Sequence, residues 1–131
     1  MNDDCIFCKI IKGDIPSYTV YEDDDFKAFL DINPITNGHV LLVPKTHYKD
    51  LFEMPEEMIM KIYKAVLKIN DKLKDKLDME GLTLIQNNGL GQDVKHYHLH
   101  LVPRYPHDDI KYLSNEKQLV EPKDVLTQID E

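Results

Sequence analysis

The sequence predicts a single α+β domain with a five-stranded antiparallel sheet, one long helix and a short terminal helix. Its 131 residues are enough for one hydrophobic core but too few for two. Several short β-rich runs are separated by turn residues, and one segment has the spacing of an amphipathic helix. Hairpins combined with one long helix are typical of α+β domains.

The first part of the sheet is predicted before the long helix. Residues 17–32 contain two β-rich runs on either side of an acidic turn at residues 23–25, which is typical of a hairpin. Turn residues then break the chain at Pro34 and Gly38. The nearly continuous apolar run at residues 39–44 predicts a third strand. This strand ends at a proline, which has no N–H to donate to a ladder.

The long helix is predicted from Pro55 to about Leu77. Apolar residues recur there at intervals of three and four, with lysines between them. They are Ile59, Ile62, Val66, Ile69 and Leu73. Pro55 suits the first helical position, and Gly81 closes the segment. This spacing predicts one helical stripe that packs on the sheet or on a partner.

The second part of the sheet follows the helix. Residues 82–86 predict a fourth strand, and residues 96–102 predict a fifth strand that stops at Pro103. The tail at residues 105–131 is polar and weakly patterned, and it predicts only a terminal helix from Pro122.

The charge and the cysteine content exclude several classes of protein. The net charge of −8 argues against nucleic acid as a main partner, because such binding depends on clustered lysine and arginine. No apolar run reaches the roughly 18 residues that a membrane span needs. Cys5 and Cys8 are the only two cysteines and lie too close together to staple a fold. The lack of a disulfide framework is consistent with a reducing compartment, and we expect a cytoplasmic protein without membrane partners.

Three histidines alternate with other residues in the predicted fifth strand. Side chains at every second position of a strand share one face, so His96, His98 and His100 line one side. Three imidazoles are poor packing material and titrate near neutral pH, which favours a functional role. Three interpretations are open. The run is an exposed histidine-rich face, a metal site, or a nucleophilic site in which a neutral imidazole attacks phosphorus.

The loop before the histidines favours nucleophilic catalysis. Gly89 and Gly91 let backbone N–H groups approach an anion closely, and Asn87 and Gln92 add side-chain donors. These donors are expected to converge where a phosphate sits. A loop with two glycines is also a common turn, so by itself it indicates little.

Residues 96–102 resemble the signature of the histidine triad (HIT) family, in which three histidines alternate with apolar residues. The flanks of this run are also similar to the family, namely Asn87-Asn88-Gly89, Gly91-Gln92, Pro103-Arg104 and the upstream segments 28–32 and 38–45. The resemblance covers about Cys5 to Arg104. It implies one HIT-like domain over residues 1–131, with residues 105–131 as a C-terminal tail.

The resemblance implies a nucleotide hydrolase or transferase that cleaves at the α-phosphate through a nucleotidyl-histidine intermediate. The substrates that it implies are purine nucleotide derivatives of the nucleoside phosphoramidate or acyl-adenylate type, as for an adenosine 5′-monophosphoramidase. His98 matches the nucleophile, and His100 matches the histidine that contacts the phosphate and positions His98. His39 matches a further histidine near the phosphate, and His96 belongs to the supporting layer.

The resemblance also implies a nucleotide site around these histidines. Asp31 matches the carboxylate that accepts hydrogen bonds from the ribose hydroxyls. The phosphate loop is matched by Asn87, Gly91 and Gln92. The base and ribose pocket is matched by Phe7, Ile10, Phe29, Leu30 and Ile32. An apolar residue on a strand is usually core, and an aspartate before a turn is usually a cap, so both roles stay open for these residues.

Two features depart from the family pattern. Asp93 stands where the family usually has Ser or Thr, whose hydroxyl meets the phosphate or the leaving group. A carboxylate at this position repels an anion or raises the pKa of a nearby imidazole, and either effect slows turnover. The loop at residues 87–92 is also shorter than the common family form.

Cys5 and Cys8 have the spacing of half a zinc site, and two histidines are able to complete it. The candidates are His47, His96 and His107. Ordinary thiols and a redox pair are the alternatives, but the pair does not open a helix inside a βαβ unit as redox pairs do. The pattern resembles a zinc-bearing branch of the family, which implies a structural zinc ion held by Cys5, Cys8, His47 and His96.

The resemblance further implies a homodimer formed through the long helix and the sheet edge. Three alternative functions stay open. The first is a dinucleoside polyphosphate hydrolase. The second is a nucleotide-binding scaffold with little activity, which Asp93 favours. The third is a structural module whose only ligand is zinc.

Overall fold

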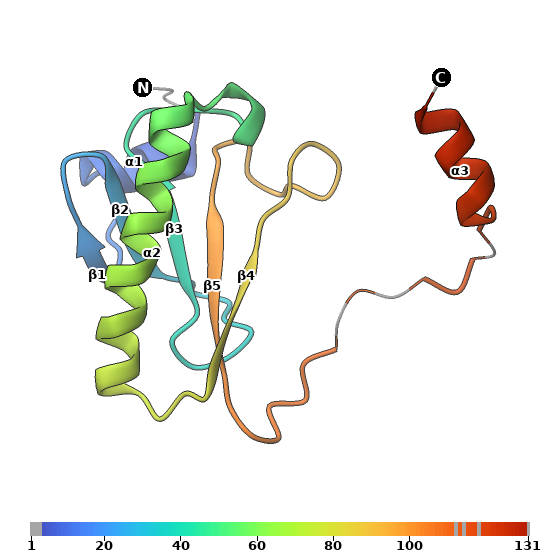
Figure 1. Ribbon diagram of the computed structural model, residues 1–131. Helices are drawn as coiled ribbons and strands as arrows, with labels where there is room; N and C mark the ends of the chain where they lie inside the picture. Colours follow the sequence, from blue (N-terminus) through green and yellow to red (C-terminus); the bar gives the residue numbers. More distant parts are fainter. Residues whose placement is uncertain (1–3, 112, 114, 118, 131) are drawn as a thin grey trace.

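The computed structural model describes residues 4–111, 113, 115–117 and 119–130. Its elements are α1 (Ile6–Lys12), β1 (Thr19–Glu22), β2 (Phe26–Leu30), β3 (Val40–Pro44), the 3₁₀ turn η1 (Leu51–Glu53), α2 (Glu56–Lys76), β4 (Gly81–Ile85), β5 (Leu99–Arg104) and α3 (Pro122–Ile129). The five strands form one antiparallel sheet in the order β1-β2-β3-β5-β4. The predicted sheet, long helix and terminal helix are confirmed (Figure 1).

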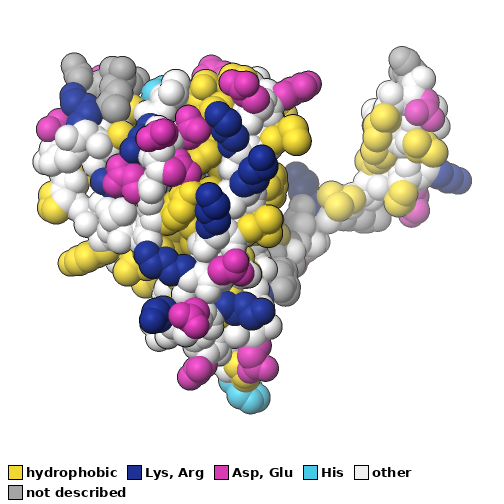
Figure 2. Space-filling view, turned by 60° about the vertical axis from the view of Figure 1, so that its left-hand side comes forward, with side chains coloured by type: hydrophobic (Ala, Val, Ile, Leu, Met, Phe, Trp, Pro, Cys, Tyr) yellow, Lys and Arg dark blue, Asp and Glu magenta, His cyan; other side chains and the backbone are white. Residues whose placement is uncertain are grey.

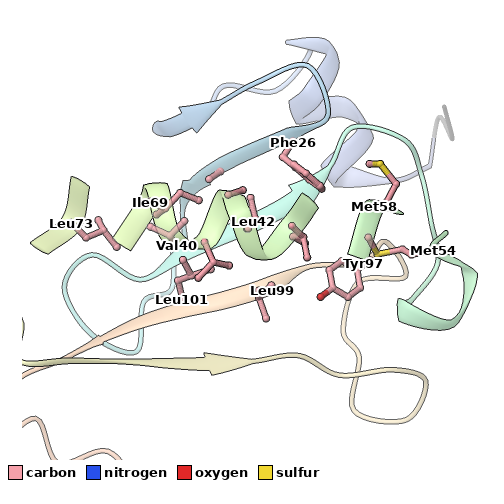
Figure 3. Packing of buried hydrophobic residues seen from close by; sticks show 14 residues of the cluster. Phe26, Val40, Leu42, Met54, Met58, Ile69, Leu73, Tyr97, Leu99 and Leu101 are labelled. Atoms are coloured by element: carbon pink, nitrogen blue, oxygen red, sulfur yellow. The ribbon is translucent and has the colours of Figure 1, made fainter. Parts of the chain in front are cut away.

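The sheet has a core on each face. The larger core lies between the sheet and α2 (Figure 3). The smaller one lies on the opposite face and includes residues of α1. All five residues of β3 are buried because their side chains alternate between these cores. Val40 and Leu42 face α2, whereas Leu41 and Val43 face α1. The continuous apolar run that predicted this strand is explained by burial on both faces.

The long helix is confirmed with two small differences at its ends. Pro55 is the residue that precedes the helix and not its first helical residue. Gly81 opens β4 and does not end the helix, which stops at Lys76. Of the predicted stripe, Ile62, Val66, Ile69 and Leu73 are buried against the sheet, and Ile59 is partly buried against the same core. Helix α2 therefore covers the larger core on the side opposite the sheet.

Helix α1 was not predicted from the sequence. Its N-terminus is capped by the thiol of Cys5, which accepts a hydrogen bond from the backbone N–H of Cys8 at 3.3 Å. Gly13 ends the helix in the left-handed conformation, with φ 87°. The cysteine pair therefore opens a helix, but not the helix of a βαβ unit. No strand precedes the helix within the described residues, so the βαβ setting of a redox pair is absent there.

The fifth strand begins later and ends later than predicted. β5 starts at Leu99 and not at His96, because the ladder with β3 ends at the pair Leu42 and Leu99. The alternation nevertheless extends upstream of the strand, since Tyr97 lies in the larger core with Leu99 and Leu101. Pro103 does not stop the strand. It pairs with β4 beyond the last residue that pairs with β3.

Gly38 allows the sharp entry into β3. Its φ is 89°, and a Cβ atom there would lie 2.6 Å from Cδ1 of Leu77. A side chain at this position is therefore strained by the backbone conformation, and the side chain of Leu77 would have to shift to admit it. The turn places the next residue, His39, within hydrogen-bonding distance of His100 in β5.

The C-terminal helix buries none of its side chains. Figure 2 shows it apart from the rest of the chain, with hydrophobic side chains uncovered. Among the described residues, no helix combines the length and the apolar character that crossing a membrane requires.

Candidate functional site

His98 lies on the face of the sheet that carries α1. Its Nδ1 lies 2.8 Å from the carbonyl oxygen of His96. A carbonyl only accepts hydrogen bonds, so Nδ1 carries the proton and Nε2 keeps a lone pair in the neutral ring. The ring of Phe7 packs edge-on against His98 with centroids 5.1 Å apart. The backbone and α1 together fix the orientation of this imidazole.

His39 and His100 form a second, connected pair. The backbone N–H of Ile35 donates to Nδ1 of His39 at 3.0 Å, so the proton of His39 is on Nε2. That Nε2 lies 2.9 Å from Nδ1 of His100 and 3.6 Å from a carboxylate oxygen of Asp31. Because Nδ1 of His100 accepts this hydrogen bond, the proton of the neutral His100 ring is on Nε2. The ring centroid of His100 is 5.0 Å from that of His98. The predicted proximity of His39, His98 and His100 is observed.

Burial keeps the supporting histidines neutral. It lowers the pKa of His100 to about 4, and the neighbouring His98 and His39 act in the same direction. Burial also lowers the pKa of His39, although Asp31 opposes the shift. Near pH 7 both rings are therefore neutral and serve as directional donors and acceptors.

The low pKa of His100 predicts acid sensitivity. The ordinary value is 6.5 and the folded value about 4, so between them the unfolded chain binds more protons. Stability is present above pH 6.5 and is lost as the pH falls towards 4. In His100→Asn the amide oxygen accepts the hydrogen bond of His39 without a titrating ring. Between pH 7 and 4.5, the free energy of unfolding of this variant, measured with urea, is expected to fall by about 2 kcal/mol less than that of the wild type. His107→Asn, at an exposed position, serves as the control, and an undiminished loss in His100→Asn contradicts the prediction.

A cavity of about 260 Å³ opens beside these histidines. His98, His100 and Asp31 line it together with all five predicted pocket residues, Phe7, Ile10, Phe29, Leu30 and Ile32. Phe7, Ile10 and Phe29 are also members of the smaller core, whereas Ile32 is 81% exposed. The two open roles, core and pocket wall, are thus combined in Phe7, Ile10 and Phe29.

Asp31 likewise combines its two open roles. One carboxylate oxygen accepts the backbone N–H of Asn33 at 2.9 Å, which is the cap expected before a turn. The other oxygen is the one that faces His39. The carboxylate also lines the cavity, where it is able to accept further hydrogen bonds.

Several cavity residues were missed by sequence reasoning. They are Ile6, Ile15, Pro16, Ser17, Tyr18, Asn33, Leu41 and Val94. Most lie in or just after α1, whose existence was not predicted. Leu41 was visible only as part of an apolar strand.

The predicted phosphate loop does not line the cavity. The amide of Gln92 is buried within its own loop, where Nε2 donates to the carbonyl of Lys49 at 2.7 Å. Its Oε1 accepts the backbone N–H of Gly89 at 3.2 Å. Asn87 borders a different hollow beside β4. Gly91 takes a φ of 97°, with its backbone facing Asn87. In this arrangement the three residues shape the loop and do not contact the histidines.

Asp93 lies at the cavity, next to His98. One of its carboxylate oxygens is 3.3 Å from Nε2 of His98, and the side chain is 82% exposed. The same oxygen accepts the backbone N–H of Val94 at 3.0 Å. The residue that departs from the family pattern therefore contacts the atom predicted to be the nucleophile.

Four predicted metal ligands converge on one point. Cys5, Cys8, His47 and His96 each contribute an atom, and these atoms all lie within 4.8 Å of one another. Nδ1 of His96 lies 3.3 Å from Sγ of Cys5 and 3.5 Å from Sγ of Cys8. It lies 3.1 Å from Nδ1 of His47, which is 3.3 Å from Sγ of Cys8. His107, the remaining candidate, is outside this group.

These distances fit a tetrahedral zinc site. Zinc–sulfur bonds of about 2.3 Å and zinc–nitrogen bonds of about 2.0 Å place tetrahedral ligand atoms roughly 3.3–3.8 Å apart. Nε2 of His96 donates to the carbonyl of Pro44 at 2.8 Å, which leaves the lone pair of Nδ1 facing the sulfurs. Burial lowers the pKa of His96 to about 4, so the ring is in the neutral form that a metal requires. The geometry, tautomer and protonation of the group all suit a metal ion.

The HIT domain family model matches residues 12–107. Protein hit of Bacillus subtilis is 48% identical over 109 residues, which are 82% of this chain and 75% of that protein. An adenosine 5′-monophosphoramidase of Candida albicans is 42% identical over 106 residues, with 76% and 70% of the two chains covered. An adenylylsulfatase of Arabidopsis thaliana is 37% identical over 110 residues, 82% of this chain and 56% of that protein.

Solved structures agree with this assignment. A HIT family protein of Bacillus anthracis has a TM-score of 0.84 and 41% identity, with 99% of this chain and 94% of that chain covered. A zinc-bound histidine triad family protein of Mycobacterium smegmatis has a TM-score of 0.77 and 36% identity, with 86% and 84% covered. With the histidine alternation and the cysteine–histidine group both present in the fold, the chain belongs to the HIT family.

Proposed function

We propose that this chain hydrolyses purine nucleotide derivatives at the α-phosphate through a nucleotidyl-histidine intermediate on His98. The observation that carries the proposal is the orientation of this ring. Its Nδ1–H is held by the carbonyl of His96, and its ring lines the cavity, with Nε2 3.3 Å from Asp93, which lines the same cavity. A neutral imidazole in this tautomer presents a lone pair to a bound phosphorus atom. The proposed substrates are nucleoside phosphoramidates or acyl-adenylates.

The cavity supports a nucleoside as the bound group. Its walls are mainly apolar and aromatic, with the carboxylate of Asp31 and the rings of His98 and His100 as convergent polar groups. We assign the base and ribose to the apolar wall and the ribose hydroxyls to Asp31. His100 then donates its Nε2–H to a phosphate oxygen, because its Nδ1 is engaged by His39. His96 supports His98 through its backbone carbonyl.

The reaction proceeds in two displacements. The lone pair of His98 Nε2 forms a bond to phosphorus, the bond from phosphorus to the leaving nitrogen breaks, and that nitrogen takes a proton from solvent. Water then attacks phosphorus, the electrons of the P–Nε2 bond return to His98, and the water returns one proton to solvent. The products are a nucleoside monophosphate and an amine. The fixed ring and the bound phosphate supply the orientation that such displacements need.

The named activities of relatives support this substrate class. The Candida albicans relative is an adenosine 5′-monophosphoramidase and the Arabidopsis thaliana relative an adenylylsulfatase. Both names describe cleavage next to the phosphorus of an adenosine nucleotide. We assign the phosphate loop to Asn87, Gly91 and Gln92. This role requires the loop to close over the bound phosphate.

Zinc is the proposed occupant of the group formed by Cys5, Cys8, His47 and His96. Two sulfurs and two imidazole nitrogens are ligands that zinc prefers, and four protein ligands are typical of a structural site. When bound, the ion tethers the start of α1 to the segment before β5. A reducing, cytoplasmic location is part of the proposal, because the thiols must stay reduced to serve as ligands.

A homodimer is also proposed, through the outer side of α2 and the sheet edge. Met60, Tyr63 and Leu67 follow one another at helical spacing on α2, and each is more than half exposed. Apolar side chains gathered on one side of a helix are typical of an interface. β4 is an edge strand of the sheet.

The contact of Asp93 with His98 favours a second candidate function. A carboxylate 3.3 Å from Nε2 competes with a phosphate for the same position. The second candidate is therefore a nucleotide-binding protein with little turnover. It differs from the first in the rate of the covalent step and not in the ligand.

Intact-protein mass spectrometry tests the proposal directly. The protein is mixed with an adenosine 5′-phosphoramidate and quenched at short times, without acid because the phosphorus–nitrogen bond is acid-labile. A species heavier by one adenylyl group, mapped to His98 by peptide sequencing, is the expected result. AMP binding without adduct or product supports the binding protein, and product formation without any adduct contradicts the covalent intermediate.

A further inference from the structure

Asp93 occupies the approach to the nucleophile. Its carboxylate is held 3.3 Å from Nε2 of His98 and 3.0 Å from the backbone nitrogen of Val94. A phosphorus atom poised for attack must come within about 3–3.5 Å of the same Nε2. The substrate phosphate therefore displaces the carboxylate, which is free to rotate because the side chain is 82% exposed.

A displaced carboxylate stays close to the reacting phosphate. Asp93 is anchored between the nucleoside cavity and a second hollow of about 390 Å³. The two hollows share Ile6, Asp93 and Val94, and the second one is further bordered by Asp4, Cys5, His47 and Lys95. When the nucleoside fills the first cavity, the second hollow is an adjoining space open to the leaving group, beside Cys5 and His47 of the proposed zinc site.

The described side chains that line the second hollow include two carboxylates and one ammonium group. Asp93 and Asp4 contribute carboxylates, and Lys95 is the one cation among its described lining residues. The ammonium of Lys95 donates to the carbonyl of Gly89 at 3.0 Å and to that of Gln92 at 3.1 Å. It is thus directed into the loop. A leaving group that enters the hollow meets the carboxylate of Asp93, whereas Lys95, the one cation among the described lining residues, is bound to the loop carbonyls.

We infer that Asp93 selects leaving groups that carry positive charge, such as amines with a second ammonium, and disfavours anionic leaving groups such as polyphosphates. The inference rests on the proposed phosphoramidate hydrolysis. It assigns the departure from Ser or Thr at this position a role in specificity. The interaction of two opposite charges near the surface is modest and is weakened by salt, so the selectivity is expected to decrease at high ionic strength.

Three adenosine 5′-phosphoramidates test the inference. They share the same phosphorus–nitrogen bond and differ only in the arm on nitrogen, which is aminopropyl, butyl or carboxyethyl. For the wild type, kcat/KM is expected to be highest for the cationic arm and lowest for the anionic arm. In Asp93→Asn and Asp93→Ser the ratio between the cationic and anionic substrates is expected to fall about tenfold at low salt. Any change in His98 itself affects all three substrates and cancels in the ratio.

Asp75→Asn is the matched control. It removes the same charge from an exposed position on α2 outside both hollows, and its ratio is expected to equal that of the wild type. A ratio unchanged by Asp93→Asn, or lowered equally by Asp75→Asn, overturns the inference while turnover itself upholds the proposed function. Absence of turnover of all three substrates by the wild type overturns the proposed function and the inference with it.

Discussion

Replacement of His98 by asparagine is expected to lower kcat for an adenosine phosphoramidate by a factor of about 10⁴ or more. The amide N–H of asparagine is able to keep the hydrogen bond to the carbonyl of His96, which His98 makes at 2.8 Å. Asparagine has no atom in place of Nε2, so the variant loses the nucleophile while the backbone contact is preserved. Steady-state release of AMP measures the effect, and KM is expected to change little.

His107→Asn is the matched control for this variant. His107 is exposed, and it lines neither the nucleoside cavity nor the second hollow. Its kcat is expected to equal that of the wild type. Circular dichroism and AMP binding establish that His98→Asn is folded and retains its cavity. If the folded variant keeps kcat within tenfold of the wild type, His98 is not the nucleophile and the two-displacement reaction is wrong.

The sequence was sufficient to predict the histidine arrangement because strand geometry alone determines it. Side chains alternate with a period of two wherever the backbone is extended, so His96, His98 and His100 share a face even though β5 begins only at Leu99. The start of the strand depends instead on its neighbours. The backbone N–H of Tyr97 donates to the carbonyl of Tyr48 at 2.7 Å and not to β3. No local pattern reports such a contact.

Helix α1 escaped prediction for a different reason. Its seven residues are too few to display a helical period. Its cap is the thiol of Cys5, which is not among the Ser, Thr, Asp and Asn residues that usually signal a helix start. Because α1 supplies Ile6, Phe7 and Ile10 to the cavity wall and the segment just after it supplies four more residues, the missed helix accounts for most of the missed cavity residues.

The loop before β5 shows the limit of reasoning from residue types. Gln92 has the amide donor that a phosphate requires, but its Nε2 donates to the carbonyl of Lys49, and its Oε1 accepts the backbone N–H of Gly89 in its own loop. Lys49 lies 43 positions earlier in the sequence. Whether an amide faces a ligand or folds its own loop is decided by tertiary contacts that composition does not contain.

Removal of the proposed zinc ion is expected to lower the melting temperature by roughly 10–20 °C. A ligand that binds only the folded state at a thousand times its dissociation constant stabilises it by about 4 kcal/mol, and this corresponds to such a shift for a chain of this size. The chelated and zinc-loaded forms are compared by differential scanning calorimetry, with metal content measured in parallel. A purified, reduced protein that contains no zinc and does not respond to added zinc contradicts the proposal.

Variants of the proposed metal ligands distinguish the stabilisation by zinc from the stabilisation by side-chain packing. Cys8→Ser and His47→Asn are each expected to lower the melting temperature and to abolish most of the difference between chelated and zinc-loaded protein. Cys8 is fully buried, whereas His47 is partly exposed, so the packing losses of the two variants differ. A lost response to zinc in both variants is then attributable to the shared ligand group. A response of wild-type size in both variants shows that the metal binds elsewhere.

His96 connects the proposed metal site to the proposed nucleophile. Its ring is fixed on one side by the carbonyl of Pro44 and on the other by the cysteine–histidine group. Its own carbonyl oxygen holds Nδ1–H of His98. A loosened His96 ring disturbs the backbone that orients His98, so the ligand variants are expected to lower kcat more than they raise KM. The stability of the site and the rate of its chemistry therefore depend on the same residue, in which the side chain serves the metal and the main chain serves the nucleophile.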